Sequence, residues 1–229
     1  MTMNIILNAI GITKLYQRGA ETVRALNNVD LSIEKGEMAA VVGPSGSGKS
    51  TLLNLLGGFD SPTSGRIYLK GLEISRMKEK ELTMIRRKEI GYVFQQFHLL
   101  PTLTVRENVT IPLIFSKKRD NGQVDRILEV VGLSNRANHL PSQISGGEMQ
   151  RTAIARALIH DPDVLIADEP TGNLDSEMAA SIFNLFHSIN RQGKTVLIVT
   201  HNLELAKGCS RHLHIKDGLI LDIPLKNSV

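Results

Sequence analysis

The chain has 229 residues, of which 41% are hydrophobic and 22% charged, and its formal net charge is +4. This length suits one well-buried core with room for a smaller subdomain. The positive charge is weak and scattered along the chain, so nucleic acid is not an expected partner. The densest basic run, Lys117-Lys118-Arg119, is interpreted as a solvated loop.

Cysteine content and hydropathy limit the compartment and the relation to membranes. Cys209 is the only cysteine, which excludes an intrachain disulfide and is typical of a reducing cytosol. No apolar stretch approaches the roughly 20 residues of a membrane helix, and the N-terminus lacks a signal-peptide pattern. We therefore expect no direct membrane insertion and a membrane role only through a partner.

The first 37 residues alternate short β-prone runs with turn residues, which predicts antiparallel strands over 5–7, 23–26 and 29–33. Met38–Val42 is a continuous apolar run bounded by glycine and is predicted to be a strand buried on both faces. A helix is predicted over Lys49–Leu56.

The turn between this strand and helix reads Gly43-Pro44-Ser45-Gly46-Ser47-Gly48-Lys49-Ser50 and fits the pattern G-x-x-x-x-G-K-S. Glycines let such a loop wrap so that successive backbone N–H groups point inward at phosphates, and the helix N-terminus adds partial positive charge. We expect Lys49 to reach the β- and γ-phosphate oxygens of ATP and Ser50 to ligate Mg²⁺. The alternative is a glycine-rich turn with a surface lysine.

Beyond this loop the sequence predicts a strand over 65–70, a charged helix over 78–88 and a strand over 90–94. Gln95 follows the last of these, where an amide can contact Mg²⁺ or the attacking water. A surface amide is the competing interpretation, and Gln96 leaves the assignment open by one position.

Residues 97–143 lack buried-strand signals and contain three prolines, so we interpret them as a mostly helical insertion. Within them apolar residues at i, i+3, i+4 and i+7 predict a helix that Gly132 ends. These residues are Val124, Ile127, Leu128 and Val131.

A second glycine turn, Ser145-Gly146-Gly147, follows this insertion. It is predicted to open a helix over 148–160, with Ser145 as its cap. The exposed N–H groups of such a helix form another anion site. Since the chain already holds a phosphate loop, we expect this turn to bind the ATP of another copy.

The run 164–167 is a predicted strand that ends in Asp168-Glu169. In open parallel sheets ligands bind at the carboxyl ends of the strands. Asp168 is expected to organise Mg²⁺, and Glu169 to polarise the water that attacks the γ-phosphate. A helix-capping acidic cluster before Pro170 is the alternative.

The remaining chain continues the alternation of helix and strand, which predicts parallel pairing and an α/β core. A helix places Met178, Ile182, Leu185, Phe186 and Ile189 on one face, and the strand Thr195–Val199 follows. His201 comes after that strand and can donate to a γ-phosphate oxygen. His212 and His214 are predicted to lie on the exposed face of an edge strand.

Assembled in this order, the motifs resemble those of an ATP-binding-cassette ATPase over nearly the whole chain. The resemblance implies a P-loop (RecA-like) parallel-sheet core with an N-terminal antiparallel β subdomain (1–95 and 160–229) and a helical subdomain (96–159). It also implies that Tyr16 stacks on adenine, that Thr51 joins the nucleotide site, and that His201 is a switch histidine. Asn173-Leu174-Asp175 completes the set. Ile144 stands where the family usually has leucine.

The runs 91–101 and 170–176 are similar to those of lipoprotein-release and macrolide-efflux ATPases. This implies an integral-membrane permease as partner, a position at the cytoplasmic face of the inner membrane, and a head-to-tail homodimer with each ATP between one phosphate loop and the opposite Ser-Gly-Gly turn. A regulatory module of a non-transporting membrane complex is the alternative. A DNA-repair ATPase is excluded because no heptads separate the motifs, and a plain P-loop kinase leaves Ser145 to Gly147 unexplained.

Overall fold

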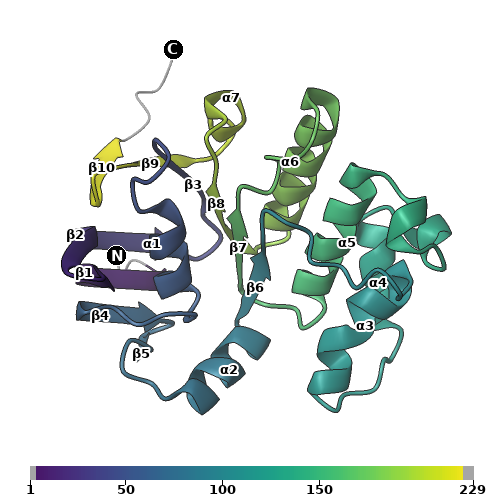
Figure 1. Ribbon diagram of the computed structural model, residues 1–229. Coiled ribbons are helices and arrows are strands. Elements are labelled where there is room, and N and C mark those ends of the chain that lie inside the picture. The colour runs from purple at the N-terminus through teal and green to yellow at the C-terminus, as the bar shows by residue number, and fades with distance from the viewer. Residues whose placement is uncertain (1–3, 224–229) are drawn as a thin grey trace.

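The computed structural model describes residues 4–223, which form two sheets with helices around them (Figure 1). The antiparallel sheet has the strand order β2(Glu21–Glu34), β1(Ile5–Arg18), β4(Ser64–Leu69), β5(Leu72–Glu73). The larger sheet has the order β10(Leu219–Ile223), β9(Arg211–Lys216), β3(Met38–Val42), β8(Thr195–Val199), β7(Val164–Asp168), β6(Ile90–Val93). All its neighbours pair parallel except β10 and β9. The α/β fold class is confirmed.

The N-terminal strands are longer than the sequence predicted, because β1 and β2 each run for 14 residues. The turn residues that suggested interruptions are absorbed as register shifts, one of which falls between the pairs Ile12–Val29 and Lys14–Leu26. Asn28 sits at this shift with φ 47°, and Asp30 accepts a hydrogen bond from the Gly11 N–H. A β-bulge therefore continues the ladder where a turn was expected.

The central strands supply two hydrophobic cores at once. In β3, Ala39 and Val41 face one core, while Met38, Ala40 and Val42 face the other. The first core lies between the two sheets and includes the leucines of α1(Lys49–Leu56). The second lies under α5(Gly146–Leu158) and α6(Ser176–Arg191) on the opposite face (Figure 1). Alternation between two cores explains the unbroken apolar run at β3.

The predicted helical insertion contains α3(Val105–Phe115), α4(Gln123–Val130) and two short turns at Ser134–Arg136 and Pro141–Gln143. It follows α2(Glu79–Lys88) and β6. Gly132, with φ 72°, lies just beyond the end of α4, as predicted. Val105 and Val109 share a core with the larger sheet, and the subdomain boundary at 96–159 stays a prediction.

The prediction of an edge strand for His212 and His214 is wrong. The strand β9 lies between β3 and β10, and β10 forms the edge. The His212 ring nitrogen Nε2 lies 2.7 Å from the Ala206 carbonyl oxygen in α7(Leu203–Ala206). Among residues 4–223, no helix is long and apolar enough to cross a membrane.

Asn108 fixes the start of α3 from inside the core. Its side chain is fully buried and accepts a hydrogen bond from the Leu100 N–H at 2.8 Å. Its amide nitrogen donates to the carbonyl oxygens of Leu100, Leu103 and Thr104 at 2.9–3.1 Å. The side chain thus satisfies a loop that has no sheet partner.

We predict that Asn108→Asp lowers the free energy of unfolding by about 3 kcal/mol, because a carboxylate cannot donate to the carbonyl oxygens that the Asn108 amide holds and its charge is buried. Denaturant titration measures this change. The matched control Asn184→Asp alters an exposed side chain on α6 and should stay within about 0.5 kcal/mol. Equal effects of the two substitutions would contradict this role of Asn108.

Candidate functional site

The ends of four parallel strands meet at a cavity of about 500 Å³. The strands β3, β6, β7 and β8 lead into the phosphate loop, Gln95, Asp168-Glu169 and His201 respectively. The cavity is lined by Val23, Arg24, Ala25, Ser45, Gly46, Gly48, Lys49, Ser50, Thr51, Gln95, Asp168, Glu169 and His201. The fold therefore gathers in one place most residues that the sequence predicted for the phosphate and acidic motifs.

The phosphate loop depends on glycine at two close approaches. Gly48 has φ 107°, and a Cβ there would lie 2.5 Å from the Ala25 carbonyl oxygen. A Cβ on Gly43 would lie 2.1 Å from the Ile215 carbonyl oxygen. Both distances are too short for a side chain, so the loop packs tightly against β2 and β9.

The first turn of α1 is built to receive an anion. Its N-cap residue, Gly48, makes no side-chain capping bond, and the turn holds no acidic residue. The N–H groups of the turn are therefore available to phosphate oxygens. The Lys49 ammonium is held by the carbonyl oxygens of Gly43 at 2.8 Å and Pro44 at 2.9 Å. Because an ammonium has three donors, one remains for a phosphate.

Asp168 and Ser50 form the oxygen-donor pair of the cavity. Burial raises the pKa of the Asp168 carboxyl, a hydrogen bond with Ser50 lowers it, and neighbouring Glu169 raises it. A cation at this point would relieve the cost of the buried carboxylate. Carboxylate and hydroxyl oxygens are hard ligands, so the pair fits Mg²⁺.

Glu169 is held in a strained and specific position. It has φ 47°, which is uncommon outside glycine, and its N–H donates to the Val199 carbonyl oxygen. Its Oε2 atom lies 2.8 Å from His201 Nδ1 and accepts a hydrogen bond from the His201 N–H at 3.2 Å. The His201 side chain is 69% exposed and that of Glu169 only 14%, so the histidine is the movable partner.

The Ser-Gly-Gly turn lies elsewhere. Glu148 N–H donates to Ser145 Oγ at 3.3 Å, and Ser145 N–H donates to Glu148 Oε2 at 2.8 Å, a capping box that confirms the predicted cap. Ser145 and Gly147 line a small cavity of about 130 Å³ that shares no lining residue with the phosphate cavity. Within one chain the phosphate loop and the Ser-Gly-Gly turn are thus separate sites, and the binding of another copy's ATP by this turn stays a prediction.

Tyr16 lies beside the phosphate cavity without lining it. It pairs across the sheet with Val23, which does line the cavity, so the two side chains share a face. The Tyr16 hydroxyl donates to Asp60 Oδ2 at 2.9 Å, and the Lys14 ammonium lies 5.0 Å from the ring centre. Burial and the neighbouring Asp60 raise the pKa of Tyr16.

The sequence did not indicate that Val23, Arg24 and Ala25 of β2 line the cavity. They belong to no motif, and tertiary contacts bring them there, because β2 packs against the phosphate loop at Gly48 and the Asn27 N–H donates to the Gly218 carbonyl oxygen. The sequence also did not indicate the hydrogen bonds that hold the backbone at and after Gln95. Asn173 donates to the Gln95 carbonyl oxygen at 3.1 Å, and Arg156 donates to those of Phe97 and His98.

Comparison with known proteins finds a matching family model and relatives of high sequence identity. A family model described as ABC transporter matches residues 26–172. The chain is 46% identical over 219 residues to the "Macrolide export ATP-binding/permease protein MacB" of Chlorobaculum tepidum, and the match covers 95% of this chain but 34% of that protein. It is also 46% identical to the uncharacterized ABC transporter ATP-binding protein YknY of Bacillus subtilis, covering 92% and 93% of the two chains.

Solved structures agree with the fold. A dimeric post-hydrolysis state of the ATP-binding cassette MJ0796, bound to ADP and phosphate, superposes with a TM-score of 0.89 at 42% identity. That match covers 97% of this chain and 100% of the other. A nucleotide-free cassette from an ABC transporter superposes with a TM-score of 0.81 at 29% identity, covering 95% and 90%.

We predict that Glu169→Gln leaves ATP affinity unchanged and slows ATP hydrolysis about 100-fold or more, since an amide cannot take a proton from water. Steady-state phosphate release and nucleotide titration measure the two quantities. Glu177→Gln, an exposed change in the first turn of α6, is the matched control. Hydrolysis by Glu169→Gln at the wild-type rate would remove Glu169 from the catalytic role.

Proposed function

The chain belongs to the ABC transporter family, is an ATPase and uses ATP with Mg²⁺, and we propose that two copies form, head to tail, the motor of a membrane transporter. In this proposal the catalytic residues are Glu169, His201 and Gln95. Each ATP contacts the phosphate loop of one copy and the Ser145-Gly146-Gly147 turn of the other. The core (1–95 and 160–229) and the helical subdomain (96–159) are the two moving parts of each copy.

The separation of the two anion sites within one chain carries this proposal. The phosphate cavity has cations, an oxygen-donor pair and a candidate base, but the turn at Ser145 lines a different cavity. Gly146 packs on Leu174, and Gly147 packs on Met178 in the first turn of α6. Both partners lie in the part of the chain that follows Glu169. A second copy is the simplest source of a glycine turn for the phosphate cavity. The cassette MJ0796, 42% identical, is described as dimeric.

Each residue of the cavity has a task that its position allows. The N–H groups of the α1 first turn and the Lys49 ammonium hold the phosphates, and Ser50 with Asp168 holds Mg²⁺. When bound, Mg²⁺ neutralises charge that develops on the phosphate oxygens. Glu169 takes a proton from the attacking water, and His201 leaves its bond to Glu169 to donate to the γ-phosphate.

The same donors make the dimer a switch. With ATP present, the γ-phosphate satisfies N–H groups from both copies, which favours the closed state. After hydrolysis this shared anion is lost, and the equilibrium shifts toward separated copies. The free energy available to move a partner equals the difference between the partner's binding free energies for the two states.

A groove of about 600 Å³ is the proposed docking site of the permease. Its wall includes the ring cluster Phe59, Tyr92 and Phe94, with ring centroids 4.5–6.0 Å apart. Phe94 directly precedes Gln95, and Arg156 in the groove holds the backbone of Phe97 and His98. Movement of a segment in this groove would therefore reach Gln95 and, through Asn173, the Glu169 segment.

Among transporters, we infer an export or lipoprotein-handling role. The support is the 46% identity to a protein described as a macrolide export ATP-binding/permease protein, whose length this chain covers by only 34%. A role of this kind places the chain at the cytoplasmic face of the inner membrane, held there by a permease.

Phe59→Asp should abolish co-purification with the permease that accompanies the tagged wild-type chain, and leave the ATPase rate of the isolated chain unchanged. The side chain is 47% exposed in the groove, so its charge would be buried only on docking. Leu221→Ser, 59% exposed on β10, is the control. Undiminished co-purification of Phe59→Asp would rule out this groove.

A further inference from the structure

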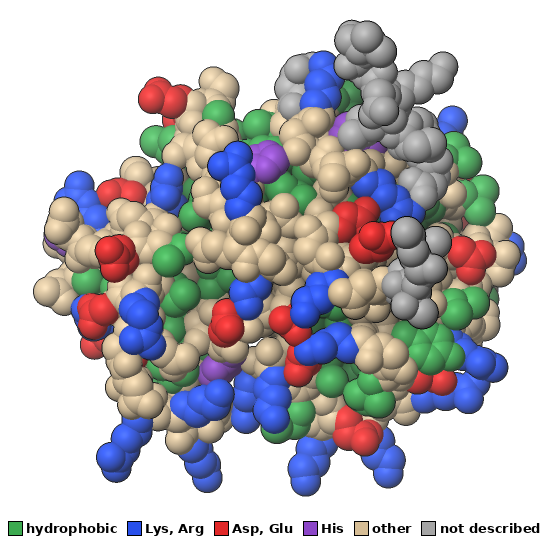
Figure 2. Space-filling view, turned by 180° about the vertical axis from the view of Figure 1, so that it is seen from behind, with side chains coloured by type: hydrophobic (Ala, Val, Ile, Leu, Met, Phe, Trp, Pro, Cys, Tyr) green, Lys and Arg blue, Asp and Glu red, His purple; other side chains and the backbone are tan. Residues whose placement is uncertain are grey.

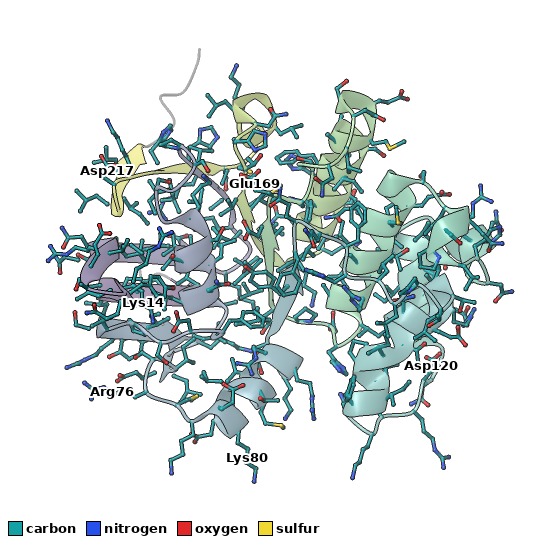
Figure 3. The ribbon with its side chains drawn as sticks, in the orientation of Figure 1. Lys14, Arg76, Lys80, Asp120, Glu169 and Asp217 are labelled. Carbon is teal, nitrogen blue, oxygen red and sulfur yellow. The ribbon has the colours of Figure 1, made fainter. Side chains whose placement is uncertain are left out.

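One edge of the molecule carries cations that the ATP site does not use. Lys and Arg side chains project along the lower edge in Figure 2, where Figure 1 shows α2 and the end of α3. Figure 3 labels Lys80 at this edge and Glu169 far from it. We name this surface the basic edge, and its cations are Lys80, Arg87, Lys88, Lys117, Lys118 and Arg119.

The basic edge is not neutralised by nearby carboxylates. None of its six cations forms an ion pair within the described residues 4–223. Glu79 is paired with Arg86, and Glu89 with Lys70. Asp120 accepts a hydrogen bond from the Val124 N–H at 3.2 Å. The carboxylates of Glu81 and Asp120 keep their charge, but the six cations outnumber these two, so the net charge of this edge is positive.

Exposed apolar side chains stand beside these cations. Phe115 is 74% and Ile114 is 67% exposed, more than the other large hydrophobic residues in the described part of the chain. The Lys117 N–H donates to the Ile114 carbonyl oxygen and the Lys118 N–H to that of Leu113, both at 3.0 Å. These bonds close the end of α3 and hold the basic run next to Ile114.

A basic pocket of about 340 Å³ lies between α2 and this turn. Its lining residues are Met84, Arg87, Lys88, Ser116, Lys118 and His160, and every titratable one is basic. Burial lowers the pKa of His160, and the charges of Lys118 and Arg87 lower it further. Three permanently charged cations, Arg87, Lys88 and Lys118, thus surround a space that suits a phosphate group, while the Ser116 hydroxyl donates to the Leu113 carbonyl oxygen at 2.9 Å.

Helix electrostatics alone do not account for this arrangement. One lysine near the last turn of α3 would compensate its dipole. Phe115 also lines the groove proposed for the permease, which leaves Ile114 as the apolar side chain of the basic edge. Three consecutive cations next to an exposed isoleucine side chain are typical of surfaces that rest on an anionic lipid bilayer, where the cations meet headgroups and the apolar group reaches the acyl boundary. The wide separation from Glu169 leaves the catalytic cavity free while this edge is occupied.

We propose that the basic edge binds the anionic phospholipid headgroups of the membrane directly, with a lipid phosphate in the pocket between α2 and α3 and Ile114 at the acyl boundary. This contact adds to the proposed docking on a permease and does not require it. It orients the ATPase at the bilayer, with the groove beside it facing the membrane.

The test uses the purified chain without permease or nucleotide, sedimented with vesicles. We expect binding to vesicles that mix phosphatidylglycerol with phosphatidylcholine, weakening as salt rises, and little binding to phosphatidylcholine alone. The double variant Lys117→Gln/Lys118→Gln should lose about 25-fold in partition coefficient, roughly fivefold for each charge. Ile114→Ser should weaken binding further.

The matched control Arg18→Gln/Lys216→Gln removes the same charge elsewhere, and both double variants should keep the wild-type ATPase rate in solution. Equal loss in the two double variants would mean that net charge alone attracts the chain and would overturn the proposal. So would equal binding to neutral vesicles, or full displacement from vesicles at constant ionic strength by inorganic phosphate or by a single-stranded oligonucleotide. Because no permease is present, failure here would leave the proposed motor function standing.

Discussion

Parallel pairing of β3, β6, β7 and β8 is the constraint on which the site depends. It brings the carboxyl ends of four strands to one edge and so places Lys49, Gln95, Asp168 and His201 around one cavity, although they are far apart in sequence. The strands are buried on both faces, which fixes their register against two cores. A slip in register would move the phosphate loop relative to the acidic pair.

The same constraint supports the proposal that one copy is insufficient. The helix α5 packs beyond β6 on the far side of the sheet from α1, so its capped N-terminus lies away from the phosphate loop (Figure 1). Its other end is tied to the segment after Gln95 through Arg156. The helix α5 therefore has a glycine turn at one end and, near the other end, Arg156 in the docking groove. Such a helix can transmit a partner's movement to nucleotide chemistry. The two proposals, a composite site and a permease groove, thus meet in one element.

Local signals predicted the parts that are locally determined. The helix Lys49–Leu56, the strands Met38–Val42 and Thr195–Val199 and the cap at Ser145 follow from glycine turns, apolar runs and capping chemistry, and the structure has them within the predicted bounds. Local signals failed where contacts with distant parts of the chain determine the conformation. Asn27-Asn28 resembles a turn, but pairing with β1 turns it into a bulge, and β9 gains a second neighbour that its own pattern does not reveal. Arg24 in the cavity and the groove at Phe59 arise only from tertiary packing.

The central claim is that neither copy hydrolyses ATP without the other's glycine turn. Lys49→Met disables the phosphate loop and Ser145→Arg blocks the turn, so each variant alone should be inactive. In an equal mixture about half of the dimers combine the two variants, each with one intact composite site, so about a quarter of the wild-type rate should return. A mixture as inactive as its components, with mixed dimers demonstrated by differential tags, would contradict the account.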